Sequence, residues 1–294
     1  MQGRLFLILS IIPMTSAFAL MVDAYQSEVE QFRERREANL KRDESWLTVA
    51  GLFWLRPGEM KVGGGASNDV VLPASAPSAV GVLTLSAEGK ASFRPEPGVK
   101  ITLKDKPFKG GAIRSDADGG PDVLAVGDLR LILIKRGDRY AIRLKDNQSA
   151  IRKNFAGLDW FPVSANWRFR GKFIPNAESK PVVFDTIVGS QDILQSPGLV
   201  EFEVDGKPFR LLAAQEGDTL WFVFRDTTSG KTTHGGARQL YAPLPKGGIV
   251  DLDFNKATNL PCAYTPFATC PLAPSQNRLP VAITAGEKKY EPRH

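Results

Sequence analysis

Apolar and polar residues alternate with a period of two along most of this chain. In one clear case, Val200, Phe202 and Val204 alternate with Glu201 and Glu203, as in a strand with one buried face. Dipeptides that favour tight turns separate such segments. With 27 glycines and 21 prolines, short strands joined by hairpins explain the chain better than alternating strands and helices. The pattern therefore predicts a mainly β fold of antiparallel sheets.

One helix precedes the strands, at residues 23–43. Tyr25, Val29, Phe32 and Leu40 recur at three- and four-residue spacing and form a single apolar stripe. The polar positions carry both acids and bases, many at i,i+4 distances, whereas a helix that lies on a membrane surface carries fewer acids. We therefore expect a surface helix that packs on a β domain.

The length of 294 residues suits two domains. We place the boundary near Asn154, after a polar turn that ends the strands of the first half. Residues 46–153 are predicted to form a first β domain and residues 154–290 a second, each a sandwich or a barrel, with the two packed together. Aromatic residues are frequent after the boundary. We assign them to the core, because aromatic side chains bury large areas.

The composition is that of a soluble protein with sizeable cores, since 43% of the residues are hydrophobic and 24% are charged. The formal net charge is +6, but the basic residues are scattered among acids rather than gathered in one tract. Binding to nucleic acid requires a concentrated basic face. We therefore expect no nucleic-acid partner.

Residues 1–19 have the pattern of an export signal. Arg4 supplies a positive start, Leu5–Ile12 an apolar run, and Ala17-Phe18-Ala19 a small-x-small cleavage site. The apolar run is too short to span a bilayer comfortably. We predict an exported protein, periplasmic or extracellular, with no membrane span after the signal is removed. The alternative is an uncleaved N-terminal anchor.

The segment 251–278 is a long stretch without periodicity that holds both cysteines and four prolines. Loops of this length are usually functional or held by a covalent link. In an oxidising compartment a close pair such as Cys262 and Cys270 most often forms a disulfide, which would stabilise the chain by roughly 2–3 kcal/mol. Two free structural thiols, or one nucleophilic thiol, are the alternatives.

The same segment begins with two carboxylates. Alternation places Asp251, Asp253 and Asn255 on one strand face. An EF-hand is excluded, because Lys256 stands where the loop requires glycine and Cys262 where it requires glutamate. Neighbouring carboxylates shift each other's pKa values and are candidates for general acid–base catalysis. A solvated strand face is the alternative.

Arg238 is a candidate for anion binding, because it follows two glycines that allow close approach of a ligand. The alternative is a structural ion pair with Asp251 or Asp253. The chain has two histidines, which excludes a multi-histidine zinc site, and a mixed site of His234, both cysteines and a carboxylate is the one combination left. We predict no metal and no cofactor.

The segments Asn68–Pro73 and Leu124–Leu129 lie within a region, residues 58–134, that resembles a forkhead-associated domain. The resemblance implies a β-sandwich. Such domains recognise phosphothreonine, but here the glycines at 63–65 have no neighbouring arginine, and the region has no histidine. Because a phosphate requires charge-assisted donors, we do not extend phosphopeptide binding to this chain.

Four motifs cover nearly all of the chain after the signal. They are WLTVAGLFWL at 46–55, LDWFPV at 158–163, DTTSGKTT at 226–233, and the C-terminal motif that runs from DFN at 253–255 through both cysteines to NRLP at 277–280. Together they resemble the uncharacterised domain-of-unknown-function family 1684. The resemblance implies no established activity. The family pattern has an aromatic residue at the position of His234, so we do not expect a mechanism that depends on this histidine to be shared by the whole family.

We therefore expect a small-molecule or glycan-binding module with a polar site in the C-terminal domain. The predicted ligand-binding residues are Arg238, Asp253, Asn255, Asn277 and Arg278. One alternative is a cofactor-independent hydrolase in which Asp251 or Asp253 is the general base. Another is a structural module that binds a second component of the cell envelope. The site hypotheses require the polar groups to converge on one pocket, and whether the chain is an enzyme stays open.

Overall fold

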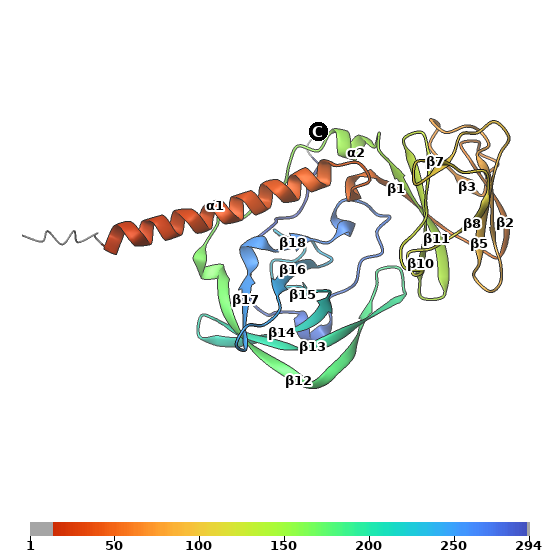
Figure 1. Cartoon of the computed structure of the whole chain (residues 1–294). Coiled ribbons are helices and arrows are strands. Elements are labelled where there is room, and N and C mark those ends of the chain that lie inside the picture. The colour runs from red at the N-terminus through yellow and green to blue at the C-terminus, as the bar shows by residue number, and fades with distance from the viewer. Residues whose placement is uncertain (1–13, 293–294) are drawn as a thin grey trace, which may run out of the picture.

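The computed structural model describes residues 14–292 (Figure 1). One long helix, α1 (Met14–Lys41), leads into antiparallel sheets, so the predicted N-terminal helix and the mainly β fold are confirmed. The predicted export signal, residues 1–19, lies mostly outside the described residues, and export stays a prediction. Within residues 14–292, no helix has the length and apolar character needed to cross a bilayer.

Two sheets form the first part of the molecule. The six-stranded sheet has the order β1-β11-β10-β9-β6-β7, and the five-stranded sheet has the order β3-β2-β4-β5-β8. Buried side chains from both sheets share one hydrophobic core, so the sheets face each other as a sandwich. The strands are β1 (Val49–Trp54), β2 (Gly58–Gly63), β3 (Val70–Val71), β4 (Gly81–Leu85), β5 (Ala91–Pro95), β6 (Thr102–Leu103), β7 (Lys106–Pro107), β8 (Gly111–Ile113), β9 (Val123–Val126), β10 (Leu129–Arg136) and β11 (Arg139–Asp146).

A seven-stranded sheet forms the second part, in the order β17-β12-β13-β14-β15-β16-β18. It curls over a core rich in phenylalanine, so that β17, at one end of the order, contacts β16 near the other end. The described strands leave β17 and β18 as free ends and do not close into a barrel. The strands are β12 (Arg168–Asp185), β13 (Gln191–Val204), β14 (Lys207–Glu216), β15 (Thr219–Phe224), β16 (Arg238–Pro243), β17 (Ile249–Asp253) and β18 (Thr258–Asn259).

The change from the first sheets to the second falls at the short helix α2 (Ala150–Lys153), next to the boundary proposed near Asn154. The remaining residues that the structure describes are irregular, apart from five 3-10 turns. These are η1 (Trp46–Thr48), η2 (Ala165–Trp167), η3 (Phe254–Lys256), η4 (Pro261–Ala263) and η5 (Ser275–Asn277). The division into two domains stays a prediction.

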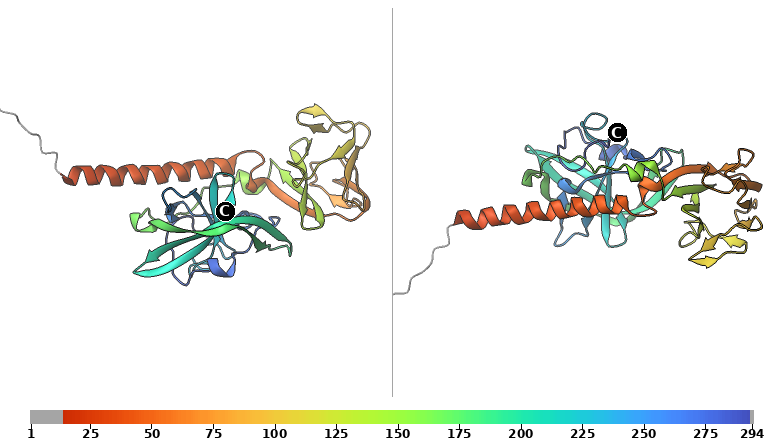
Figure 2. Two further views of the ribbon diagram at one scale, coloured as in Figure 1. Left: turned by 60° about the horizontal axis from the view of Figure 1, so that its bottom comes forward. Right: turned by 90° about the horizontal axis from the view of Figure 1, so that it is seen from above.

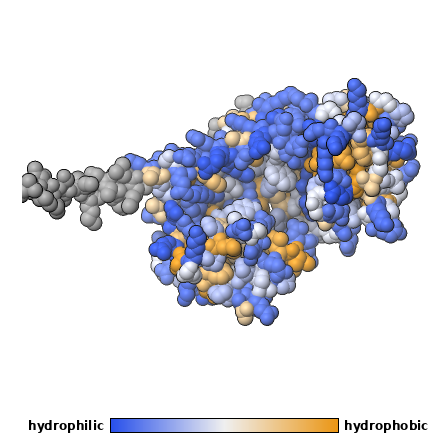
Figure 3. All heavy atoms as spheres, in the orientation of Figure 1, coloured by the Kyte–Doolittle hydropathy of each residue, from blue (hydrophilic) through white to orange (hydrophobic). Residues whose placement is uncertain are grey.

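Helix α1 runs along the second part of the molecule (Figure 2). Its apolar residues Val29 and Leu40 are buried, and polar side chains add directional contacts. Arg33 donates to the carbonyl of Phe161 at 2.9 Å. The carboxylate of Glu37 accepts from the backbone amide of Leu158 and from the indole of Trp160. The surface of α1 in Figure 3 is mostly hydrophilic. The helix is thus a surface element that polar and apolar contacts both fix to the sheet.

Candidate functional site

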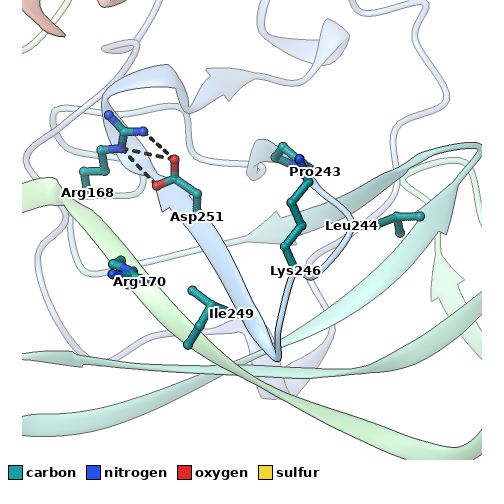
Figure 4. Close-up of a pocket in the computed structure, with 7 residues that line it drawn as sticks. All are labelled: Arg168, Arg170, Pro243, Leu244, Lys246, Ile249 and Asp251. Carbon is teal, nitrogen blue, oxygen red and sulfur yellow. Dashed lines mark hydrogen bonds and ion pairs between the residues drawn. The ribbon is translucent and has the colours of Figure 1, made fainter.

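A cavity of about 600 Å³, called here the cavity between β12 and β17, lies over the face of these two hydrogen-bonded strands, beside the segment 243–246 (Figure 4). Strand β12 contributes two arginines, the turn between β16 and β17 contributes a lysine and two apolar residues, and β17 contributes an isoleucine and an aspartate. The lining residues are Arg168, Arg170, Pro243, Leu244, Lys246, Ile249 and Asp251. Three cationic side chains therefore share the cavity with one carboxylate.

Strand geometry explains how these groups meet. Arg168 and Arg170 are two residues apart and project from the same face of β12. In the antiparallel register Arg170 pairs with Asp251, and Arg168 pairs with Asp253. The two residues after Lys246 are glycines with φ of 57° and 75°, which is the conformation that a tight two-residue hairpin turn requires. This turn returns the chain into β17 and leaves Lys246 at the mouth of the cavity.

Asp251 is engaged by Arg168 through both of its oxygens. Arg168 Nε lies 3.0 Å from Oδ1, and Nη2 lies 2.5 Å from Oδ2. This bidentate contact raises the pKa of the Arg168 guanidinium and is the geometry that holds a carboxylate most firmly. The guanidinium also lies 5.1 Å from the ring of Tyr25 on α1. Asp251 is therefore part of the cavity wall, with both oxygens already bonded.

The other two cations of the cavity have no such partner. Among the described residues, the side chains of Arg170 and Lys246 form no hydrogen bond and no ion pair. Both residues are exposed, so water satisfies their side chains in the free protein. The single carboxylate of the wall is already paired with Arg168, and the cavity therefore carries an excess of positive charge.

Asp253 and Asn255 lie together, but away from this cavity. Strand β17 ends at Asp253, whose side chain accepts from the Asn255 amide at 3.1 Å and caps the 3-10 turn η3. The alternation predicted Asn255 on the strand face, but the residue lies in the turn η3 instead. Its side chain bonds to both backbone groups of Ser164 at 3.0 and 2.8 Å, and Tyr25 donates to Asp253 at 2.8 Å. These two residues fasten α1 and the segment before β12.

Arg238 is fully buried, contrary to the expected contact with a ligand. Its guanidinium donates to Asp226 at 2.6 Å and to the carbonyls of Ile283 and Ala285 at 3.0 and 2.5 Å. Burial lowers the pKa of this guanidinium, against the attraction of Asp226. Arg238 therefore forms a structural ion pair, as the alternative interpretation proposed. Its partner is Asp226, however, and not Asp251 or Asp253. Arg238 ties the C-terminal segment to β16.

Asn277 and Arg278 also lie outside the cavity. Asn277 is buried and bonds to both backbone groups of Leu212, at 2.7 and 3.0 Å, and to the carbonyl of Val223 at 3.0 Å. It therefore bridges β14 and β15. Arg278 donates to Ala273 at 3.3 Å and lines a different cavity of about 480 Å³. The five residues predicted to bind a ligand thus do not converge on one pocket.

The two cysteines are free thiols in this structure, so the expected disulfide is not formed. Pro261 begins the turn η4, which orients the Cys262 amide toward Cys270 Sγ at 3.1 Å. His234 Nε2 lies 3.3 Å from Cys262 Sγ. Within the part of the chain that the structure describes, no three His, Cys, Asp or Glu residues are arranged to hold a metal ion.

The sequence interpretation missed Arg168, Arg170 and Lys246. The sequence Arg168-Phe169-Arg170 does place two cations on one face of a strand, and this signal was available. What was missing is the pairing of that strand with β17, about eighty residues later. Without it, two arginines on a strand are indistinguishable from an ordinary solvated face.

Comparison with known proteins identifies the family. The chain belongs to the family described as Protein of unknown function (DUF1684), whose model matches residues 153–288. It is also similar to an uncharacterized protein from Haloarcula marismortui, solved by solution NMR, with 31% sequence identity and a TM-score of 0.40. That match covers 47% of this chain and 78% of the other. No curated protein matches.

Proposed function

We propose that this protein binds a small organic anion in the cavity between β12 and β17. The observation that carries the proposal is that Arg170 and Lys246 line a cavity of about 600 Å³ without an anionic partner. A carboxylate or phosphate that entered would gain charge-assisted hydrogen bonds from both. The volume lies in the range of cavities that hold small molecules.

The lining of the cavity indicates the kind of anion. Leu244, Pro243 and Ile249 contribute apolar surface next to the cations (Figure 4), so a ligand with carbon surface gains more than a bare ion does. The planar fork of Arg170 suits a carboxylate or phosphate with two oxygens in reach. An acidic sugar or a short organic acid combines both features. Among glycans, we therefore propose that the cavity binds acidic ones.

The contact between Arg168 and Asp251 supports binding over hydrolysis. A general base must have an oxygen available to the water or hydroxyl that it deprotonates. Both oxygens of Asp251 accept from Arg168, and Asp253 is buried beneath α1 with Tyr25 and Asn255 bonded to it. The hydrolase alternative requires one of these contacts to break, whereas anion binding requires none to break.

A thermal-shift panel tests the proposal. We expect glucuronate, citrate or inorganic phosphate to raise the melting temperature of the full chain, and glucose, which is uncharged, to leave it unchanged. Raising the ionic strength should weaken the effect, because salt screens partly exposed charges. If no anion in the panel binds, the structural envelope module becomes the better description.

Asp251→Asn separates binding from hydrolysis. The substitution releases Arg168 from its ion pair and adds a third available cation to the cavity, so we expect anion affinity to rise by about three- to tenfold. If Asp251 is a catalytic base, the same variant loses turnover of ester, glycoside or phosphate substrates that the wild type cleaves. Wild-type turnover that disappears in the variant would contradict a purely binding role.

We also propose that the chain is exported, on the strength of the signal pattern at residues 1–19. N-terminal sequencing of protein recovered outside the cytoplasm should begin after Ala19. Recovery of the intact N-terminus in the membrane fraction would favour the uncleaved anchor.

A further inference from the structure

A second chemical cluster lies apart from the anion cavity, at the start of η4. It consists of His234, in the segment between β15 and β16, with Cys262 and Cys270. His234 Nε2 and Cys262 Sγ are 3.3 Å apart, which is within hydrogen-bonding distance for sulfur. None of the three residues lines the cavity between β12 and β17. The anion-binding function leaves the cluster unexplained.

Gly236 makes the approach of the histidine to the thiol possible. A Cβ atom at this position would lie 2.7 Å from His234 Nε2 and 3.5 Å from Cys262 Sγ. The first distance is too short for nonbonded atoms, so any larger residue would displace the imidazole. Gly236 thus bears on the contact between His234 and Cys262, and Pro261 begins the turn that carries Cys262.

The surroundings favour the thiolate at Cys262 and the thiol at Cys270. Hydrogen bonding from the Cys270 thiol, followed by His234, lowers the pKa of Cys262 to about 5, against the effect of burial. The Cys262 sulfur and burial raise the pKa of Cys270, against the hydrogen bond from the Cys262 amide and the attraction of the Arg143 guanidinium from β11. Thiolates of low pKa next to a histidine are the reactive form of cysteine in proteins.

The two sulfurs differ in exposure. Cys262 and His234 are partly exposed, whereas Cys270 is 5% exposed. A small reactant therefore meets Cys262 before the buried Cys270, whose sulfur lies 3.1 Å from the Cys262 amide. This is the arrangement of an attacking thiol with a resolving thiol behind it.

We propose that Cys262 is a nucleophilic thiolate that reacts with low-molecular-weight disulfides, and that Cys270 resolves the mixed disulfide. Cys262 Sγ attacks one sulfur of the small disulfide, the S–S bond breaks, and one small thiolate leaves. That thiolate takes the proton of the Cys270 thiol. Cys270 Sγ then attacks Cys262 Sγ and expels the second small thiolate. The protein thiolate–thiol pair is oxidised to the Cys262–Cys270 disulfide, and the small disulfide is reduced to one thiol and one thiolate, which takes a proton from water.

The reduced structure is thus one of two states of the pair. A disulfide requires the sulfurs to approach to about 2.05 Å, so the contact between the Cys262 amide and Cys270 must change. The residue before Cys270 is held firmly, because Thr269 accepts from Arg136 at 2.9 Å and from Arg143 at 3.2 Å. The turn η4 is therefore the side that moves.

Alkylation by iodoacetamide measures the state of Cys262 in the full reduced chain. We expect Cys262 to react at pH 6, with a rate that is half-maximal near pH 5, because the rate follows the thiolate fraction. Cys270 should stay unmodified until the chain is unfolded. His234→Asn should move the half-maximal pH upward. A Cys262 that reacts only above about pH 8, as an ordinary cysteine does, would overturn the proposal.

Glutathione disulfide tests the two-step exchange. In the wild type we expect an internal disulfide and two released glutathione molecules, detected by mass spectrometry. Cys270→Ser should stop at a stable mixed disulfide on Cys262, and Cys262→Ser should not react. Circular dichroism shows whether each variant is folded, and Cys262→Ala replaces the serine variant if that one unfolds. A Cys270→Ser protein that is folded and forms no mixed disulfide would contradict the assignment.

Discussion

Tyr25 donates a hydrogen bond of 2.8 Å to the buried carboxylate of Asp253, which lies 228 residues later in the sequence. The same hydroxyl accepts from Asn255 at 2.8 Å. The contact joins the N-terminal helix to the end of β17, the strand that also carries Asp251. Because the Tyr25 ring also lies 5.1 Å from the guanidinium of Arg168, α1 contacts one residue of the cavity wall.

Tyr25→Phe removes the hydroxyl and leaves a buried carboxylate short of one donor. We expect a loss of about 1–3 kcal/mol in the free energy of unfolding, because a hydrogen bond to a charged group is lost while Asn255 still donates to the same oxygen. Urea denaturation measures it. Tyr241→Phe is the matched control, since it removes a hydroxyl that bonds to Glu216 on the surface at 3.1 Å. Equal losses in the two variants would contradict a special role for Tyr25.

The buried pair of Arg238 and Asp226 gives a second test of the structural interpretation. Arg238→Met leaves the carboxylate buried and unpaired, and we expect a loss of about 3–5 kcal/mol. The double variant Arg238→Met with Asp226→Asn removes the unpaired charge, so it should be more stable than the single one. A double-mutant cycle from denaturant unfolding measures the difference. Additive losses would show that the two side chains do not interact.

Stability should depend on pH through Asp122 in the first sandwich. Arg114 hydrogen bonds to its carboxylate at 3.1 Å and lowers its pKa. A lowered pKa in the folded state stabilises the protein above the unfolded pKa of about 3.9, and this contribution is lost as the pH falls below that value. Asp122→Asn should therefore cost about 1 kcal/mol at pH 7 and much less at pH 3. Glu59→Gln, at an exposed site, is the control and should show no such pH dependence.

The periodicity of the sequence was sufficient for the fold class and insufficient for the site. The alternation around Phe202 predicts a strand with one buried face, and the spacing of Tyr25 and Val29 predicts a helix. Both patterns can be recognised from residues that are close together in the sequence. The pairing of Arg170 with Asp251 is a property of the folded sheet and leaves no local trace. Arg238 was misjudged for the related reason that a polar residue after two glycines suggests a loop, whereas Asp226 and two carbonyls satisfy it inside the core.

The cysteine pair shows the same limit. The spacing of Cys262 and Cys270 indicated a covalent link, and the sequence contained nothing to show that His234 would reach one of the sulfurs. The position of the histidine depends on the turn between β15 and β16 and on Gly236. The sequence was thus sufficient to predict that the two cysteines lie close together. Their unequal exposure and hydrogen bonding could not be predicted, because they depend on the folded structure.

The central claim is that two cations without partners in the cavity bind an organic anion. Calorimetric titration of glucuronate, or of whichever panel anion binds best, tests it with matched variants. Arg170→Gln with Lys246→Gln removes both free cations. Arg94→Gln with Lys207→Gln removes the same charge from exposed sites outside the cavity. We expect the first double variant to bind at least about tenfold more weakly than the wild type, and the second to stay within about twofold. Equal affinity in both double variants, or equal loss in both, would contradict the assignment of this cavity.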